Sequence, residues 1–167
     1  MNAEEKVVAI LFSTLLLLLP AAALALATDV EQAVHISADT ANFNDRTGIM
    51  VYRGNVRVTQ GSMVITAETV TTHAPERNLE RVIAEGAPAT WHQTDDDGRE
   101  VDAEALRIEY LALENRLILT DDARLLRGND RFSGARLEYD LTAETIDAVS
   151  GEKSRVEVIL QPRRGEQ

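Results

Sequence analysis

The three histidines of the chain, His35, His73 and His92, are its first candidates for acid–base or metal chemistry. They lie far apart in the sequence, and none has a second histidine three or four positions away, the spacing that places two imidazoles on one metal ion. The chain has no cysteine, which excludes disulfides, thiolate nucleophiles and cysteine-ligated zinc. No serine lies in a Gly-x-Ser-x-Gly turn, and no glycine-rich loop is present that would hold a phosphate. We therefore predict a protein that is not an enzyme and that binds no metal or cofactor.

The acidic run 95–98 (DDDG) is the remaining candidate for a metal site. Carboxylates at this spacing begin a calcium-binding loop, but the full ligand pattern of that loop, with its terminal glutamate, is absent. Asp97-Gly98 is also a favoured pair for the turn of a β-hairpin. We favour the hairpin turn.

The charge of the chain excludes one class of partner. Lysine and arginine number 17 and aspartate and glutamate 28, which gives a formal net charge of −11. A protein that binds nucleic acid needs an excess of basic side chains to replace the counterions of the phosphate backbone. We expect no nucleic acid partner.

The first 27 residues differ in composition from the rest of the chain. Residues 7–27 carry no charge, include five consecutive leucines at 15–19, and end on Ala25-Leu26-Ala27, the small-x-small pattern that precedes a signal peptidase cleavage site. We predict a cleavable signal peptide at 1–27 and one exported domain at 28–167. An uncleaved membrane anchor is the alternative, because about 20 apolar residues can cross a bilayer. In both cases 28–167 lies outside the cytoplasm.

Alternation of apolar and polar residues is the main structural signal in the exported part. Its period of two is that of a strand with one face against an apolar core. The alternation is clearest at 55–59, 106–110, 137–141 and 155–158. Turn signals separate such stretches at Thr47-Gly48, Arg53-Gly54, Gln60-Gly61, Asp97-Gly98 and Gly128-Asn129. The pattern predicts an all-β fold, either a sandwich, a barrel or a roll.

Residues 103–117 give a conflicting signal, because Leu106, Tyr110, Leu113 and Leu117 recur at helical spacing. An internal repeat favours strands, since a repeated unit should keep its conformation in each copy. The first element of the repeat has the form apolar-polar-small-x and occurs at 36–39 (ISAD), 65–68 (ITAE), 101–104 (VDAE) and 132–135 (FSGA). The second element occurs at 54–58 (GNVRV) and 121–125 (DDARL), with 86–89 (GAPA) in the corresponding place.

Repeats of about 30 residues cannot bury their apolar faces singly, so we expect units of three or four short strands to stack into one long roll. The first and last strands of such a roll carry unpaired N–H and C=O groups, which can pair with another chain. We predict these edge strands at 35–40 and 155–160. The residues assigned to assembly are His35, Ile36, Ser37, Arg155, Val156, Val158 and Leu160.

Several of these motifs together resemble a known family. They are 54–61 (GNVRVTQG), 65–68 (ITAE), 86–93 (GAPATWHQ) and 137–139 (LEY). In order and spacing, from about residue 33 to residue 160, they resemble the LptA/OstA-like family, the periplasmic component A of the lipopolysaccharide transport (Lpt) system. The resemblance implies an open, twisted antiparallel β-jellyroll, a V-shaped roll whose apolar interior groove holds the acyl chains of lipid A.

The resemblance also implies a function and partners. Members of the family are not catalytic. They associate head to tail into a bridge across the periplasm, between Lpt components C and D, and carry lipopolysaccharide to the outer membrane. Two alternatives stay open: a membrane-anchored protein like component C, and a polysaccharide-binding β module.

The interior groove is the site that the resemblance implies, and the positions matching Val34, Ile36 and Trp91 face the lipid in family members. Alternation alone would favour a closed core, in which apolar faces pack against each other. The full set of residues that we expect to line the groove is Val34, Ile36, Phe43, Tyr52, Val56, Val58, Ile65, Trp91, Ile108, Tyr110, Leu119, Phe132 and Tyr139. Five arginines lie near turns or on solvent-facing strand positions: Arg46, Arg53, Arg57, Arg124 and Arg127. They are expected mainly to keep the protein soluble, with lipid phosphates at the mouth of the groove as the alternative.

Overall fold

A computed structural model describes residues 29, 32–95, 97–152 and 155–162 of the chain. In this part the chain forms ten strands and a short 3-10 helix, Pro75–Arg77. The strands are β1 (His35–Ser37), β2 (Thr40–Asn44), β3 (Ile49–Gln60), β4 (Met63–His73), β5 (Arg81–Thr94), β6 (Glu100–Leu111), β7 (Arg116–Arg127), β8 (Asp130–Asp140), β9 (Thr145–Val149) and β10 (Glu157–Ile159). No helix among the described residues is long and apolar enough to cross a membrane. The prediction of an all-β fold is confirmed.

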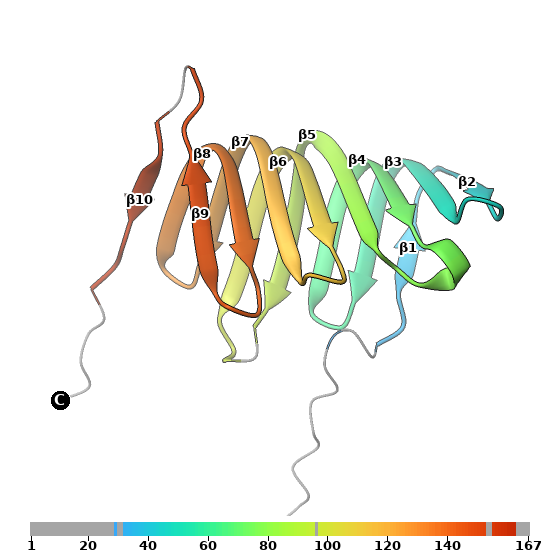
Figure 1. The fold of residues 1–167 in the computed structure, drawn as a ribbon, viewed down its shortest axis with the longest axis horizontal. Coiled ribbons are helices and arrows are strands. Elements are labelled where there is room, and N and C mark those ends of the chain that lie inside the picture. Colours follow the sequence, from blue (N-terminus) through green and yellow to red (C-terminus); the bar gives the residue numbers. More distant parts are fainter. Residues whose placement is uncertain (1–28, 30–31, 96, 153–154, 163–167) are drawn as a thin grey trace, which may run out of the picture.

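All ten strands belong to one antiparallel sheet that does not close on itself (Figure 1). Strands β3 to β8 follow one another as hairpin-connected neighbours. At one end of the sheet β1 and β2 both pair with β3, and at the other end β9 and β10 both pair with β8. The expected open antiparallel roll is therefore present.

A line of β-bulges folds this single sheet into two walls. The pairing register shifts once in each of the five pairings between β3 and β8, near the middle of the strands. A bulge bends its strand, and the bends follow one another along the top of the molecule in Figure 1. We call this line the corner. Wall one is the half of the sheet that begins with β1 and ends with β10, and wall two is the half that begins with β2 and ends with β9.

The sequence repeat marks the corner. The extra residues of the bulges are Gly54-Asn55 in β3, 86–88 in β5 and Asp121-Asp122 in β7, which are the three places where the second repeat element was found. Both residues of each pair have positive φ angles: 79° and 48° for the first pair, 63° and 53° for the second. Arg53-Gly54 was predicted as a turn between strands, and this prediction is wrong, because the chain bends there without leaving β3.

The repeating unit is a hairpin of two long bent strands, not the expected three or four short ones. The small residues that precede the bend in the even-numbered strands are Ala67, Ala105 and Gly134. In β6 the first repeat element was assigned to 101–104, with Ala103 as its small residue. The structurally equivalent residue is Ala105, two positions further along the strand. Each bent strand has one segment on each wall, so a hairpin contains four short segments, as expected. The prediction was wrong about how they are connected, because a bulge and not a turn joins the two segments of a strand.

We predict that Gly54→Ala destabilises the protein by about 3 kcal/mol, as measured by urea unfolding. Gly54 has a φ of 79°, and a Cβ atom there would clash with the side chain of Asp39, the residue at which the chain passes from β1 to β2. Gly98→Ala is the matched control, because Gly98 has a φ of 76° but no atom within 4 Å of the added Cβ. That control should lose only about 1 kcal/mol, for backbone conformation alone. Equal losses of unfolding free energy at the two positions would show that the clash with Asp39 adds nothing to the cost of the Gly54 substitution.

The helical spacing in 103–117 does not correspond to a helix, because these residues form parts of β6 and β7 and the turn between them. Leu106 lies at the corner with 43% of its surface exposed, and Leu113 lies in the turn with 78% exposed. Of the three leucines in the pattern, only Leu117 is fully buried. Pairing with neighbouring strands outweighs the helix propensity of this segment.

The predicted edge strands are shorter than expected. The first, at 35–40, is divided into β1 and the start of β2, which lie on different walls. The second is β10, Glu157–Ile159, so Arg155, Val156 and Leu160 lie outside the strand to which they were assigned. The predicted signal peptide at 1–27 lies outside the described residues.

Candidate functional site

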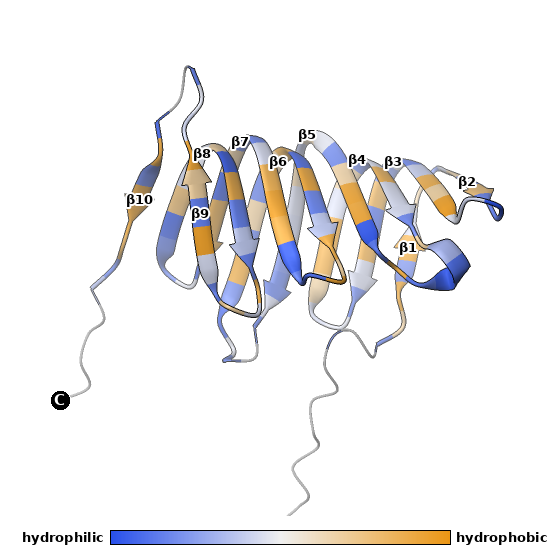
Figure 2. Ribbon diagram, in the orientation of Figure 1, coloured by the Kyte–Doolittle hydropathy of each residue, from blue (hydrophilic) through white to orange (hydrophobic). Residues whose placement is uncertain are grey.

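The space between the two walls is the candidate site. Apolar and polar residues alternate along every long strand, so each wall turns one apolar face toward the other (Figure 2). Nineteen buried apolar residues from both walls form one cluster. Seven of the residues expected to line the groove belong to it, each with 3% or less of its surface exposed: Val56, Val58, Ile65, Trp91, Ile108, Leu119 and Tyr139.

In this structure the two walls touch each other. The ring of Trp91 on wall one lies 5.1 Å from the ring of Tyr110 on wall two, centroid to centroid, at an angle of 48°. Burial raises the pKa of the Tyr110 hydroxyl, as expected for a phenol in apolar surroundings. The middle of the interior is thus packed, and any ligand that enters it must replace contacts between the walls.

The other expected lining residues are less buried. Ile36, Tyr52, Tyr110 and Phe132 are half-buried and pack against the cluster. Val34 and Phe43 are more exposed, at 47% and 56%, beside the first two strands. The structure thus places all but these two in or against one apolar cluster.

An apolar cavity of about 230 Å³ lies between the walls near the β1–β2 end. Five of its lining residues were expected from the sequence: Val34, Ile36, Val58, Ile65 and Tyr110. The others include Met50, Met63 and Val82, which lie in alternating stretches and could have been predicted from that pattern. Ala74 and Leu79 also line the cavity, but they lie in a loop, where no sequence pattern indicates it. Thr72 adds a buried hydroxyl for which the described residues supply no hydrogen-bond partner.

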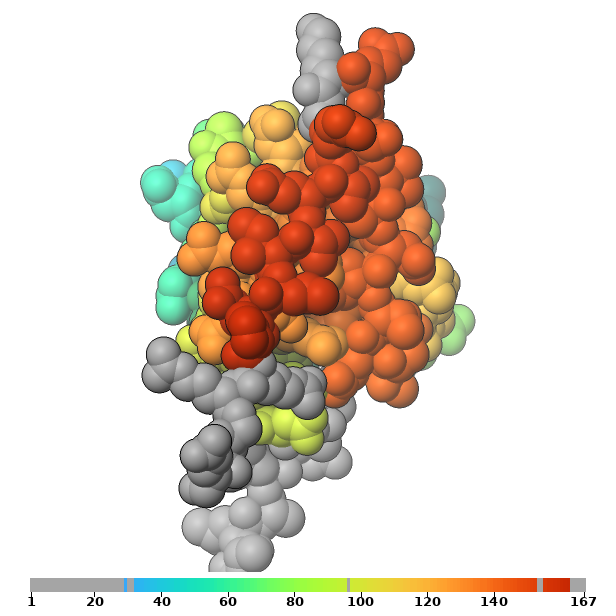
Figure 3. All heavy atoms as spheres, turned by 90° about the vertical axis from the view of Figure 1, so that its left-hand side faces the viewer, coloured from blue at the N-terminus to red at the C-terminus, as the bar shows by residue number. Residues whose placement is uncertain are grey.

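Exposed large apolar side chains gather at the two ends of the roll. Nine such residues are exposed among those described, and seven of them lie in or beside the terminal strands. Val34 and Phe43 are at the β1–β2 end. The β9–β10 end, which faces the viewer in Figure 3, carries Val149, Val156, Val158, Ile159 and Leu160. Exposed apolar groups beside unpaired strand edges are typical of surfaces that bind another protein.

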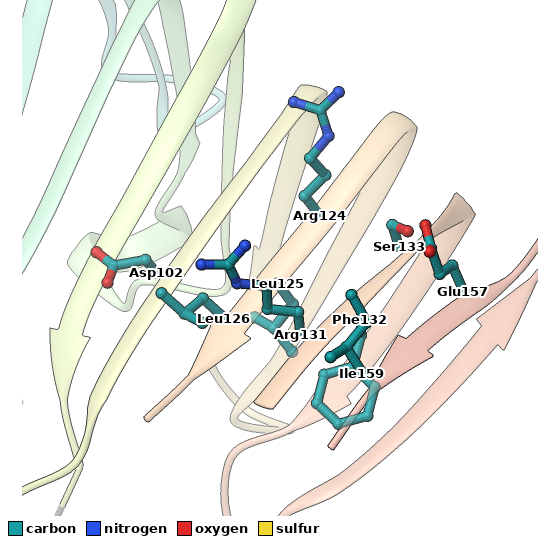
Figure 4. A pocket seen from close by; sticks show the side chains of 9 residues that line it. All are labelled: Asp102, Arg124, Leu125, Leu126, Arg131, Phe132, Ser133, Glu157 and Ile159. Atoms are coloured by element: carbon teal, nitrogen blue, oxygen red, sulfur yellow. The ribbon is translucent and has the colours of Figure 1, made fainter. Parts of the chain in front are cut away.

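A hollow of about 340 Å³ lies across β6, β7, β8 and β10 at this same end (Figure 4). Arg124, Ser133 and Glu157 occupy neighbouring register positions on three of these strands. Asp102, Leu126, Arg131 and Ile159 form a second such row. The short strand β10 therefore adds its side chains directly to those of the central sheet.

Asp95, Asp97 and Gly98 of the acidic run lie in the loop between β5 and β6, which confirms the expected hairpin. Asp95, Asp97 and Glu144 bring carboxylate oxygens within 4.8 Å of one another, but all three bind the guanidinium of Arg99, at 2.7, 2.9 and 2.6 Å. The hydrogen bond with Asp95 raises the pKa of Arg99. Burial acts to raise the pKa of Asp95, but hydrogen bonds from the backbone and side chain of Arg99 bring it below its ordinary value. Arg99 thus supplies the positive charge that this acidic group requires.

Comparison with known proteins identifies the family. Residues 35–145, which include most of the folded sheet, match the family model described as "LptA/(LptD N-terminal domain) LPS transport protein". The chain belongs to this LptA/LptD N-terminal domain family. The resemblance read from the motifs is thereby confirmed.

Relatives of the LptA family match nearly the whole chain. The lipopolysaccharide export system protein LptH of Pseudomonas aeruginosa is 34% identical over 151 residues, which cover 85% of this chain and 86% of the relative. LptA of Haemophilus influenzae is 33% identical over 95% of this chain and 94% of its own length. The crystal structure of P. aeruginosa LptH, described as the LptA-homologous periplasmic component of the lipopolysaccharide transport device, superimposes with a TM-score of 0.74 at 33% identity. It matches 81% of this chain and 100% of the LptH chain.

Proposed function

We propose that this chain is a non-catalytic carrier that binds lipopolysaccharide and passes it across the periplasm to the outer membrane. The observation that carries the proposal is one continuous apolar interior between two walls, with terminal strands at both ends whose outer edges pair with no other described strand. Family membership and relatives named for lipopolysaccharide export support it. They do not favour a polysaccharide-binding module or a protein like component C.

The packed interior suits a carrier. Burying an acyl chain contributes about 0.8 kcal/mol for each methylene, or about 8 kcal/mol for ten. A lipid that enters between the walls separates side chains that touch across the interior, such as Trp91 and Tyr110, and its acyl chains then pack against them. Apolar contacts are exchanged rather than added, so the net affinity is moderate and the lipid can leave. Because the cavity at the β1–β2 end already has a volume of about 230 Å³, we propose that the lipid enters there.

The strand directions fit head-to-tail association. Each wall contains eight strand segments: one half of each of β3 to β8, with β1 and β10 at the ends of wall one and β2 and β9 at the ends of wall two. In an antiparallel sheet with an even number of strands, the first and last run in opposite directions. A second copy in the same orientation would therefore place its β1 antiparallel to β10 and its β2 antiparallel to β9. Both walls would continue without a break.

Partners follow from the same geometry. We propose that the β1–β2 end and the β9–β10 end each accept a jellyroll partner, either another copy of this chain or Lpt components C and D. The contact is head to tail, so it can repeat and form a bridge of several copies. We also propose that residues 1–27 are removed as a signal peptide and that the domain at 28–167 works in the periplasm. Sequencing of the exported protein should then begin at Thr28, whereas a retained Met1 would indicate an anchored protein like component C.

We predict that a photo-crosslinking residue in place of Ile36 captures lipopolysaccharide in living cells, whereas one in place of Arg57 does not. Ile36 pairs with Val58 and lines the cavity between the walls, while Arg57 is the neighbour of Val58 on the exposed face of the same strand. The two positions are therefore one pleat apart but on opposite faces. Immunoblotting for lipopolysaccharide after irradiation measures the difference, which we expect to exceed about tenfold. Equal capture at both positions would refute binding between the walls.

A further inference from the structure

Two ion pairs join the free rims of the walls near the β9–β10 end. Arg99 precedes β6 and Arg127 ends β7, so both lie on the rim of wall one. Glu144 lies in the turn between β8 and β9, on the rim of wall two. Its carboxylate lies 2.6 Å from Nη2 of Arg99 and 3.5 Å from Nη1 of Arg127, and its backbone carbonyl accepts a hydrogen bond from Arg127 at 3.1 Å. Of the ion pairs among the described residues, only those of Glu144 connect the two rims.

A hollow lined by three arginines lies beside this contact. Its volume is about 750 Å³, and Arg99, Arg127 and Arg131 all line it. The one acidic lining residue, Asp130, accepts a hydrogen bond from the backbone N–H of Gln161 at 2.9 Å. Three guanidiniums around one hollow are notable in a chain with a formal net charge of −11. Arg99 and Arg127 are already paired with the Glu144 carboxylate, and Arg99 also with Asp95 and Asp97 of its own loop, so an anion binds these arginines only by displacing Glu144.

The position of Glu144 indicates which anion fits. Its two carboxylate oxygens span two guanidiniums, as the oxygens of a phosphate monoester do when arginines bind it. The backbone of Glu144 has a φ of 54°, the left-handed conformation that is unfavourable for a residue with a side chain. All of these groups are partly exposed, with 18% of the side-chain surface of Arg127 and 39% of that of Glu144 accessible, so an anion from outside can reach them.

We propose that the hollow lined by Arg99, Arg127 and Arg131 binds a phosphate monoester on the sugar head of the transported lipid, in place of the Glu144 carboxylate. This inference rests on the proposed function and names a second contact for the same ligand. Acyl chains between the walls leave the sugars at the rims, where the hollow lies. Release of Glu144 also breaks the ion pairs that hold the rims together, so a phosphorylated lipid opens the part of the groove that it enters. At the other end, beside the apolar cavity, no ion pair among the described residues joins the rims.

Binding of two lipids to the purified protein tests this site. The probes are diphosphoryl lipid A and the same lipid A after removal of both phosphates. Wild type should bind the diphosphoryl form about tenfold more tightly. R99Q/R127Q should lose that preference and bind both lipids as wild type binds the dephosphorylated one. E144Q removes the competing carboxylate and should bind the diphosphoryl form about threefold more tightly than wild type does, with dephosphorylated lipid affected less. R57Q, an exposed arginine on the outer face of wall one, is the matched control and should behave as wild type.

Several outcomes would overturn the inference. If R99Q/R127Q weakens binding of both lipids equally, the arginines only support the fold. If E144Q weakens binding of the diphosphoryl form, Glu144 is not a competitor of phosphate. R127Q/R131Q leaves the Arg99 contacts in the 95–99 loop intact and must give the same loss of preference if R99Q/R127Q proves unfolded by circular dichroism. Displacement of the lipid by millimolar inorganic phosphate alone would make the hollow a general phosphate site and refute the lipid assignment. Wild type that binds neither lipid would instead refute the proposed function itself, and this inference with it.

Discussion

Replacing Trp91 by alanine is expected to lower the free energy of unfolding of the lipid-free protein by about 3–5 kcal/mol. Trp91 is 2% exposed at the centre of the apolar cluster and packs on Tyr110 from the opposite wall. The loss consists of the transfer free energy of the indole and the cavity that it leaves. Urea unfolding followed by far-ultraviolet circular dichroism is the measurement, because Trp91 is the only tryptophan and its fluorescence disappears with it.

Phe43→Ala is the control for this prediction. Phe43 is also a large aromatic residue expected to line the groove, but it is 56% exposed on β2. Its replacement should cost about 1 kcal/mol or less, since little area is returned to water. Similar small losses at both positions would mean that the walls stand apart in the lipid-free protein, and that the packed interior described above is not its resting state.

Replacing Val158 by proline is expected to weaken end-to-end association by about 10- to 100-fold. Proline cannot donate a backbone hydrogen bond, and the acceptor left unpaired costs about 1–3 kcal/mol. Val158 is the central residue of β10, opposite Phe132 of β8, at the end of wall one where the next copy would pair. Sedimentation velocity over a range of protein concentrations measures the change.

Val158→Thr is the matched control, because threonine keeps the N–H group and the β-branched shape. Its association should be close to that of wild type. The V158P monomer itself should stay folded, with its unfolding free energy changed by about 0.5 kcal/mol, since β10 has three residues and all are exposed. Association that V158P leaves intact would exclude pairing through β10, and equal weakening by V158T would assign the contact to the side chain instead.

Much of the candidate site could be predicted from sequence alternation. The residues from Val56 to Tyr139 that were expected on the apolar face are on that face, because side chains along a strand alternate with a fixed period. The sequence repeat showed where the bends lie but not what they are. Gly54-Asn55 is a residue pair typical of a turn, and residues with the same positive φ angles also form β-bulges. Only the pairing of β3 with β4 on both sides of the bulge distinguishes the two.

The ends of the sheet were harder to predict than its middle. Short strands such as β1 and β10 carry little periodic signal, so their limits depend on the neighbour with which they pair. Arg155 and Val156 continue the alternation that leads into β10, yet they lie outside the strand, in the segment that passes from wall two back to wall one. No local pattern indicates that β9 and β10 both pair with β8 and do so on different walls.

The amino-acid sequence by itself determined the class of fold, the apolar face of each long strand and the absence of cysteine chemistry, since these depend on residue type and near neighbours. The tertiary structure decided what those apolar faces meet, namely each other, and which distant groups come together at the rims. Arg99 and Glu144 are 45 residues apart, and their contact exists only because a line of bulges folds the sheet and brings its two rims face to face. Such long-range contacts depend on the path of the whole chain, which no short window of sequence contains.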